Sequence, residues 1–230
     1  MNIIKKAMLL AVVPLFFACE NEAYDTGEGS LSNMRADFVE AQTDGQAMIT
    51  GVETDDGETL PFTRAVQAAW AEKPDTFYRA LLYYNKVDKG DGRAKAEPLA
   101  MGQVLVPTPT DIAELKGDVK TDPVTLVSAW KSRNGKYLNL ELSIKTGAVD
   151  GEYGTQTLGI INLGVETKAD GTRTASLQLY HDQAGVPEYY STTAYLSVAV
   201  ARLPFTPAKG DEVSIEIVTY DGTITKTFDF

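Results

Sequence analysis

Apolar and polar residues alternate most regularly in the second half of the chain. From Leu138 to Ile144 every second residue is apolar, and the residues between them are polar. Successive side chains of a strand point to opposite faces, so this pattern predicts a strand with one buried and one solvated face. Similar patterns predict further strands at 124–130, 157–163, 175–180, 193–201, 212–220 and 223–230.

Turn-forming dipeptides separate these expected strands. They are Asn134-Gly135, Asp150-Gly151, Asp170-Gly171 and Asp221-Gly222, and such pairs accept the positive φ that tight hairpins require. Asp221-Gly222 is expected to join the last two strands directly. Many short strands with one apolar face predict an antiparallel β-sandwich of about seven strands.

The first half of the chain is also mostly strand, with less regular patterning. Arg64 to Glu72 contains good helix formers and predicts one short helix. Phe77 to Tyr84 is apolar on both faces, which suits a barrel strand whose outer face packs on a helix or on a neighbouring domain. Five strands with one short helix predict a small OB-like barrel, so the fold class is all-β. The expected strands are 31–40, 47–53, 58–63, 76–87 and 95–106.

A composition break separates the two halves. Pro107-Thr108-Pro109-Thr110 precedes a stretch with only a short helical signal around Ile112. We therefore expect an OB-like domain over 31–107, a linker over 108–123 and a β-sandwich domain over 124–230.

The beginning of the chain has the pattern of a bacterial lipoprotein signal. Two lysines lie within the first six residues, an apolar run covers 7–17, and a small residue precedes Cys19. About eleven apolar residues are too few to cross a membrane as a helix, which takes roughly twenty. The alternative is a plain secretory signal with Cys19 as an incidental thiol. We predict a signal peptide over 1–18, lipidation of Cys19 and a flexible tether over 19–30.

Composition narrows the possible chemistry. Cys19 is the only cysteine and His181 the only histidine, so disulfides, thiolate metal sites and multi-histidine metal sites are excluded. No cofactor or metal is expected. Removal of residues 1–18 takes away two lysines and no acids, which changes the formal net charge from -11 to -13. Nucleic acid is therefore not an expected partner, because like charges repel.

One loop offers a candidate binding surface. Tyr180, His181 and Asp182 end an expected strand, and Tyr189 and Tyr190 follow the connecting loop. A histidine with an acid and tyrosines could line a groove for sugar rings or a peptide. Alternatively, the histidine caps the strand end and the tyrosines cover the sandwich edge. No group of residues indicates a catalytic site.

Several segments in this order resemble the NigD-like lipoproteins of Bacteroides and relatives. They are Gly135-Lys136-Tyr137-Leu138-Asn139, Gly159-Ile160-Ile161-Asn162-Leu163, Leu177-Gln178-Leu179-Tyr180-His181-Asp182, Tyr195-Leu196-Ser197-Val198 and Thr219-Tyr220-Asp221-Gly222. The resemblance implies an OB-like domain followed by a β-sandwich, and an envelope location at the outer membrane, on its periplasmic or cell-surface face. The family name implies an association with bacteriocin loci and self-protection, without an established biochemical activity.

Two hypotheses about function follow. The first is a non-catalytic, lipid-anchored interaction module with a protein partner. The second is a carbohydrate-binding or glycan-processing accessory protein, which rests only on the tyrosines.

Overall fold

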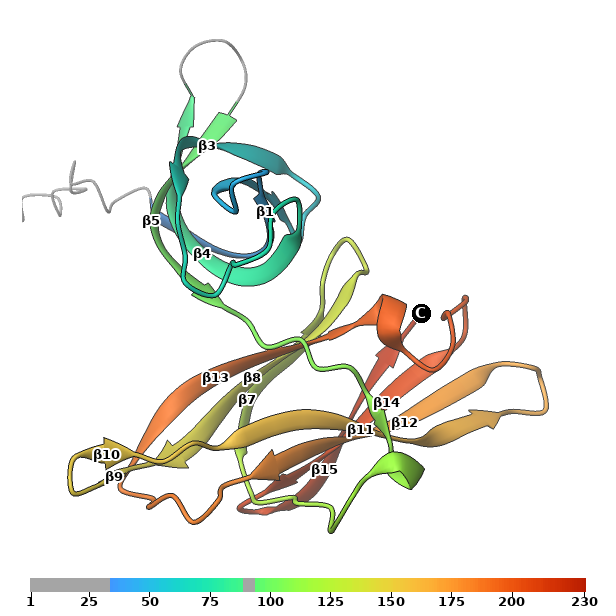
Figure 1. Ribbon diagram of the computed structural model, residues 1–230. Coiled ribbons are helices and arrows are strands. Elements are labelled where there is room, and N and C mark those ends of the chain that lie inside the picture. The colour runs from blue at the N-terminus through green and yellow to red at the C-terminus, as the bar shows by residue number, and fades with distance from the viewer. Residues whose placement is uncertain (1–33, 89–93) are drawn as a thin grey trace, which may run out of the picture.

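The computed structural model describes residues 34–88 and 94–230, which form two β domains joined by one connecting segment (Figure 1). Cys19, the signal peptide, the tether and the turn expected at Asp91-Gly92 lie outside the described residues. A closed barrel comes first, and a two-layered sandwich follows it. The all-β fold class is therefore confirmed.

Five strands close the N-terminal barrel in the order β1-β2-β3-β5-β4. Its core is apolar and includes Val39, Leu60, Leu82 and Tyr84, all fully buried. The β3–β5 pair is parallel and the other pairs are antiparallel. The strands are β1 (Met34–Thr43), β2 (Ile49–Thr54), β3 (Thr59–Val66), β4 (Phe77–Asp88) and β5 (Ala94–Gln103).

The short helix expected over 64–72 is wrong. Residues 64–66 continue β3, because Val66 pairs with Ile49 of β2. Residues 67–76 form turns, within which Trp70 packs edge-on against Tyr78 at 5.8 Å. Ladder pairing and burial of the tryptophan override the local helix propensity of this segment.

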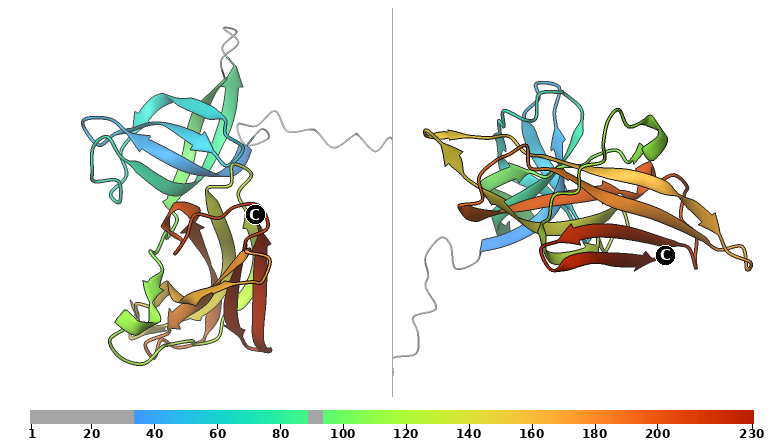
Figure 2. Two further views of the ribbon diagram at one scale, coloured as in Figure 1. Left: turned by 90° about the vertical axis from the view of Figure 1, so that its right-hand side faces the viewer. Right: turned by 90° about the horizontal axis from the view of Figure 1, so that it is seen from below.

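The sandwich contains all seven predicted strands in two sheets (Figure 2). One sheet has the order β13-β8-β7, with β7 (Thr125–Lys131), β8 (Tyr137–Thr146) and β13 (Tyr190–Ala199). The other has the order β15-β14-β12-β11-β6, with β6 (Thr110–Asp111), β11 (Thr157–Thr167), β12 (Arg173–Asp182), β14 (Glu212–Thr219) and β15 (Gly222–Asp229). A small hairpin of β9 (Ala148–Val149) and β10 (Glu152–Tyr153) connects β8 to β11.

The apolar face of β8 lies in the sandwich core, as its alternation predicts. Leu138, Leu140 and Leu142 are fully buried there against residues of the facing sheet, such as Leu177 and Ile215. Tyr137, Asn139 and Glu141 point to the other face by the same alternation. That outer face is the one turned toward the barrel.

The glycines at two expected turns have the positive φ that the sequence predicts. Gly135 between β7 and β8 has φ +72°, and Gly222 at the start of β15 has φ +118°. The expected tight hairpin joins the last two strands, but its turn lies one residue earlier than Asp221-Gly222, because Gly222 pairs with Thr219 and leaves Tyr220 and Asp221 as the turn. Two 3-10 turns, Ile112–Glu114 and Val200–Arg202, are the only helical elements among the described residues, and the first matches the helical signal near Ile112.

Two features go beyond the sequence patterns. β12 and β14 pair in parallel, because the chain crosses to β13 in the other sheet between them. β6, which falls in the expected linker, adds in parallel to the edge of β11.

Candidate functional site

A buried arginine joins the two domains. Arg79 lies on the outer face of β4, and its side chain is 1% exposed. Its Nη1 and Nη2 donate to the two carboxylate oxygens of Asp55, at 2.6 and 2.7 Å. This bidentate geometry is the strong form of an arginine–carboxylate pair.

The remaining donors of Arg79 reach across to the sandwich. Nη2 donates to Oδ1 of Asn139 at 3.1 Å, and Nε lies 3.4 Å from Oγ of Ser197. The guanidinium also lies 4.1 Å from the ring centroid of Tyr137. Arg79 thus bonds a carboxylate of its own domain and two side chains of the second domain.

A second set of polar contacts surrounds the hairpin between β7 and β8, which projects toward the barrel (Figure 1). Lys136 Nζ lies 2.6 Å from Glu40 and 2.8 Å from Glu53, and the Tyr137 hydroxyl donates to Glu40 at 2.8 Å. Burial works to raise the pKa of Glu40, but the bonds from Lys136 and Tyr137 outweigh it and lower that pKa. Burial and the bond to Glu40 raise the pKa of Tyr137.

Aromatic packing completes the contact between the domains. Phe38 of β1 meets Trp130 and Tyr195 edge-on, each at 5.3 Å between ring centroids. The neighbouring domain therefore covers Phe38 of β1 and Arg79 of β4, whereas Phe77 at the start of β4 is exposed. Together these contacts fix the barrel on the sandwich.

A cleft of about 650 Å³ opens where the domains meet. Phe77, Tyr137, Leu105 and Arg202 line it, and the Arg202 guanidinium donates to the Val106 carbonyl at 3.0 Å. Pockets at domain junctions commonly bind ligands. Arg79, Tyr137 and Arg202, which line it, already form hydrogen bonds within the protein.

The predicted binding residues separate into buried and exposed groups. His181 is 1% exposed; its Nδ1 lies 2.9 Å from the Asp122 carbonyl oxygen, and its Nε2 lies 2.8 Å from Gln156 Oε1. This histidine therefore ties β12 to the connecting segment inside the protein. Asp182 accepts a bond from the Ala184 N–H, which shapes the loop that follows.

The tyrosines lie on the surface near this loop. Tyr189 is 72% exposed and Tyr190 is 47% exposed, whereas Tyr180 is only partly exposed and packs against Gly159. Ligand binding by these tyrosines stays a prediction.

Three further residues, Lys145, Glu188 and Tyr220, extend the tyrosine surface, and the sequence did not single them out. Lys145 Nζ lies 4.4 Å from the ring centroid of Tyr220 and 3.1 Å from a carboxylate oxygen of Glu188. Lys145, Glu188, Tyr189, Tyr190 and Tyr220 are called the distal loop surface below. Tyr220 lies in the turn between β14 and β15, and that position at a sheet end was the only available signal.

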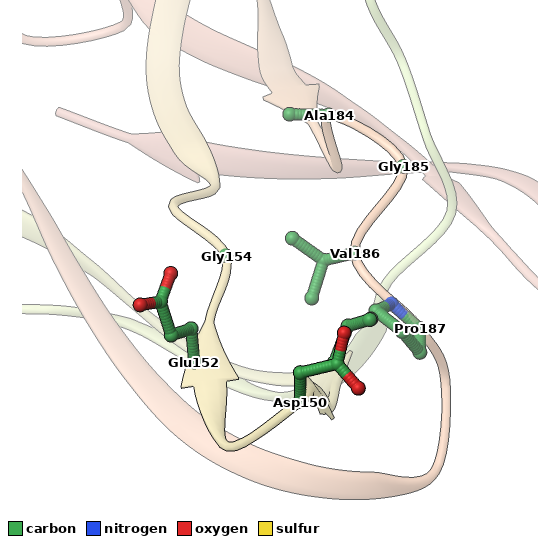
Figure 3. Close-up of a pocket in the computed structure, with 8 residues that line it drawn as sticks. Asp150, Glu152, Gly154, Ala184, Gly185, Val186 and Pro187 are labelled. Atoms are coloured by element: carbon green, nitrogen blue, oxygen red, sulfur yellow. The ribbon is translucent and has the colours of Figure 1, made fainter.

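A pocket of about 600 Å³ lies beside the distal loop surface, between the β9–β10 hairpin and the loop of residues 184–187 (Figure 3). Val186 reaches from the loop toward Gly154, and a Cβ built on Gly154 would lie 2.5 Å from Val186 Cγ2. Asp150 and Glu152 place carboxylates on the hairpin side. Val186 can take this position only because position 154 has no side chain.

The described residues contain neither a metal-binding cluster of side chains nor a membrane-spanning helix. Within residues 34–88 and 94–230, no cluster of three or more histidine, cysteine or acidic side chains could hold a metal ion. In the same ranges, no helix has the length and apolar character needed to span a bilayer.

Solved structures share this two-domain fold. An immunity protein of NigD-like type from Bacteroides caccae has a TM-score of 0.65 and 24% identity, over 85% of this chain and 97% of that one. A protein provisionally named as toxin-related, from Parabacteroides distasonis, has a TM-score of 0.62 and 16% identity, over 86% and 93%. A protein provisionally named as a lipoprotein, from Bacteroides fragilis, has a TM-score of 0.58 and 16% identity, over 85% and 96%.

No curated protein matches the chain significantly. A family model does: the NigD-like C-terminal beta sandwich domain matches residues 107–230, which is more than half of the chain. This match covers both sheets of the sandwich and begins just before β6. The chain therefore belongs to the NigD-like family.

Proposed function

We propose that this protein is a non-catalytic, lipid-anchored envelope protein that binds a protein partner through the distal loop surface. Lipid on Cys19 would hold the tether and the barrel close to the membrane. The sandwich would then carry the distal loop surface outward.

The placement of the anchor rests on the sequence around Cys19 and on the name of the Bacteroides fragilis relative in fold. Two lipid attachments at one cysteine provide stable membrane association at about 0.8 kcal/mol per buried methylene. Outer-membrane attachment, on the periplasmic or the outer face, fits this arrangement.

The single observation that carries the proposal is the position of the distal loop surface. Ser197 lies at the barrel end of β13, where it meets Arg79, and Tyr190 lies at the other end of the same strand. A strand rises about 3.3 Å per residue, so more than about 20 Å separates Tyr190 from the barrel contact. The exposed tyrosines are thus remote from the domain to which the tether leads.

Tyrosine suits protein recognition, because its ring gives a large apolar contact and its hydroxyl a polar one. Tyr189 is the most exposed of the described large apolar residues, and it follows Pro187, which lines the 600 Å³ pocket together with Val186, by two positions in the chain. A narrower form of the proposal is bacteriocin self-protection, which draws support from the immunity name of the Bacteroides caccae relative. In that form, deletion of the gene sensitises the cell to one specific toxin.

Affinity capture from envelope extracts tests the proposal. The wild-type chain is expected to retain a defined partner, and the double variant Tyr189→Ala/Tyr190→Ala is expected to lose it. Phe77→Ala is the matched control, because Phe77 is also well exposed (59%) but lies at the cleft beside the barrel. Retention of the same proteins by the double variant would contradict the proposal.

Carbohydrate binding is the second candidate, because the open ring of Tyr189 could also stack on a sugar. A glycan array separates the two functions. Binding that disappears in Tyr189→Ala would favour the carbohydrate function, and an empty array would remove it.

A further inference from the structure

Three of the outer strand edges of the sandwich are protected. β6 covers part of the β11 edge. β15 carries Lys226 and Asp229, and it faces β7 across the gap between the sheets, where Lys131 Nζ donates to the Asp229 carbonyl oxygen. β7 is interrupted by a bulge between Leu126 and Ser128. Charges, bulges and covering strands are the usual ways in which proteins prevent unwanted strand pairing.

β13 has none of these protections along most of its length. It pairs with β8 in unbroken register from Tyr190 to Ala199, and residues 189–201 contain no charged residue, no proline and no glycine. Residues 190–193 are exposed. Within the part of the chain that the structure describes, no strand pairs with the edge of β13 that faces away from β8.

Backbone hydrogen bonds show which groups point to this open edge. The Val200 N–H donates to the Lys136 carbonyl on the β8 side, whereas the Ser197 N–H points the other way and donates to the Leu105 carbonyl at 2.8 Å. Successive residues alternate in an antiparallel strand. The N–H and C=O groups of Ser191, Thr193 and Tyr195 therefore point away from β8, toward the open edge.

The same contacts limit where another strand can add. The segment at Leu105 already occupies the edge at Leu196 and Ser197, and β13 begins at Tyr190. The open stretch is thus 191–195, and Thr193 is the outward-pointing residue at its middle. An added strand would continue the contact that the Leu105 segment begins.

We propose that the open edge of β13 pairs antiparallel with β13 of a second copy of this chain, about a two-fold axis at Thr193. Thr193 then faces its own counterpart, and Ser191 faces Tyr195 of the second copy. Threonine pairs directly across strands are favourable, and the uncharged edge brings no like charges together in this acidic protein. The two three-stranded sheets become one sheet of six strands.

The axis of such a pair is perpendicular to the sheet, so both barrels stay on the same face of the joined sheet. Antiparallel pairing also places them toward opposite ends of the two β13 strands. Both chains can therefore lead back to one membrane. An isologous contact of this kind closes the assembly at two copies.

Cysteine pairing tests the register, since Cys19 is the only native thiol. In the full chain with Cys19→Ser, Thr193→Cys is expected to form a disulfide-linked dimer on mild oxidation, because residues opposed across a strand pair lie within disulfide reach. Thr225→Cys is the control, since Thr225 is equally exposed on the edge strand β15. Equal cross-linking of the two variants, or cross-linking of neither, would overturn the proposal.

Proline substitution tests the same edge without a cross-link. Thr193→Pro removes only an N–H that points away from β8, and an edge strand tolerates proline at such a position. We expect Thr193→Pro to remain folded by circular dichroism and to halve the mass measured by light scattering. Thr192→Pro, whose N–H points to β8 opposite Ile144, should instead unfold more easily. A wild-type chain that stays monomeric across a concentration series would also refute the pairing.

Discussion

Arg79 of the barrel and Asn139 of the sandwich are joined by a hydrogen bond of 3.1 Å between Nη2 and Oδ1, at a place where both residues are buried. The same guanidinium holds Asp55 in a bidentate pair. One cation therefore satisfies a carboxylate in its own domain and an amide in the next. The two domains are linked through a shared buried charge.

Replacement of Arg79 is expected to destabilise the protein strongly. Arg79→Ala leaves the largely buried Asp55 carboxylate without its cation, whereas Asn139 keeps its bond from Ser197. Breaking such a buried pair by removing one partner typically costs about 3–5 kcal/mol. Urea unfolding measures the loss. Arg133→Ala is the control, because the Arg133–Asp56 pair is 82% and 64% exposed and such surface pairs contribute about 0–1 kcal/mol. Equal losses in the two variants would show that the buried pair has no special role.

His181 is predicted to support the fold. His181→Ala leaves the Asp122 carbonyl oxygen and Gln156 Oε1 without their partner, which costs about 1–3 kcal/mol for each unsatisfied group. Tyr189→Ala should change the free energy of unfolding by less than about 0.5 kcal/mol, as is usual at the surface. Thermal melts of both variants check this contrast. A stable His181→Ala protein that has lost its partner would instead assign the histidine to binding.

Acid should weaken the sandwich through Asp211. Bonds from Arg173 and from the Ala208 N–H lower the pKa of Asp211 from its ordinary value of 3.8 to about 2. A carboxylate with a lowered pKa in the folded state stabilises the protein above its ordinary pKa, and this stabilisation is lost as pH falls toward the folded value. The wild-type chain should therefore exceed Asp211→Asn in stability at neutral pH. That advantage should shrink between about pH 4 and pH 2, and a constant difference in urea midpoints would contradict the assignment.

The pocket beside the distal loop surface depends on Gly154. In Gly154→Ala the new Cβ would meet Val186 Cγ2 at 2.5 Å, so the Val186 side chain or its loop must shift, and overpacking of this kind costs about 1–3 kcal/mol. We expect lower stability and weaker capture of the partner. Adding Val186→Ala should restore both properties, and Gly45→Ala should be neutral, because nothing lies within 4 Å of a Cβ at Gly45. Failure of the second substitution to rescue would exclude this contact as the cause.

Much of the fold could be predicted because its information is local. The alternation from Leu138 to Ile144 specifies which face of β8 is buried, and Asp221-Gly222 specifies a hairpin. Both signals depend only on neighbouring residues. The segment 64–72 was misassigned because barrel closure, which involves distant strands, determines its conformation.

The candidate site was harder to predict, because its contacts join distant parts of the chain. Arg79 and Asn139 are 60 positions apart in the sequence. Lys145 belongs to one sheet of the sandwich, and Tyr220, which it contacts, follows a strand of the other sheet. A single arginine within the apolar run 77–84 was the only sign of the buried pair. His181 is buried and Tyr189 is exposed, although the sequence pattern predicts both on one surface.

We propose that lipid on Cys19 tethers the protein to the membrane and that the sandwich carries the distal loop surface away from it. The most direct test is mass spectrometry of the amino-terminal peptide of the mature protein, isolated from envelope membranes. We predict a chain that begins at Cys19 and bears a thioether-linked diacylglycerol and an amide-linked acyl chain. A mature chain with a free thiol at Cys19, or one that begins elsewhere and is recovered from the soluble periplasm, would contradict this account.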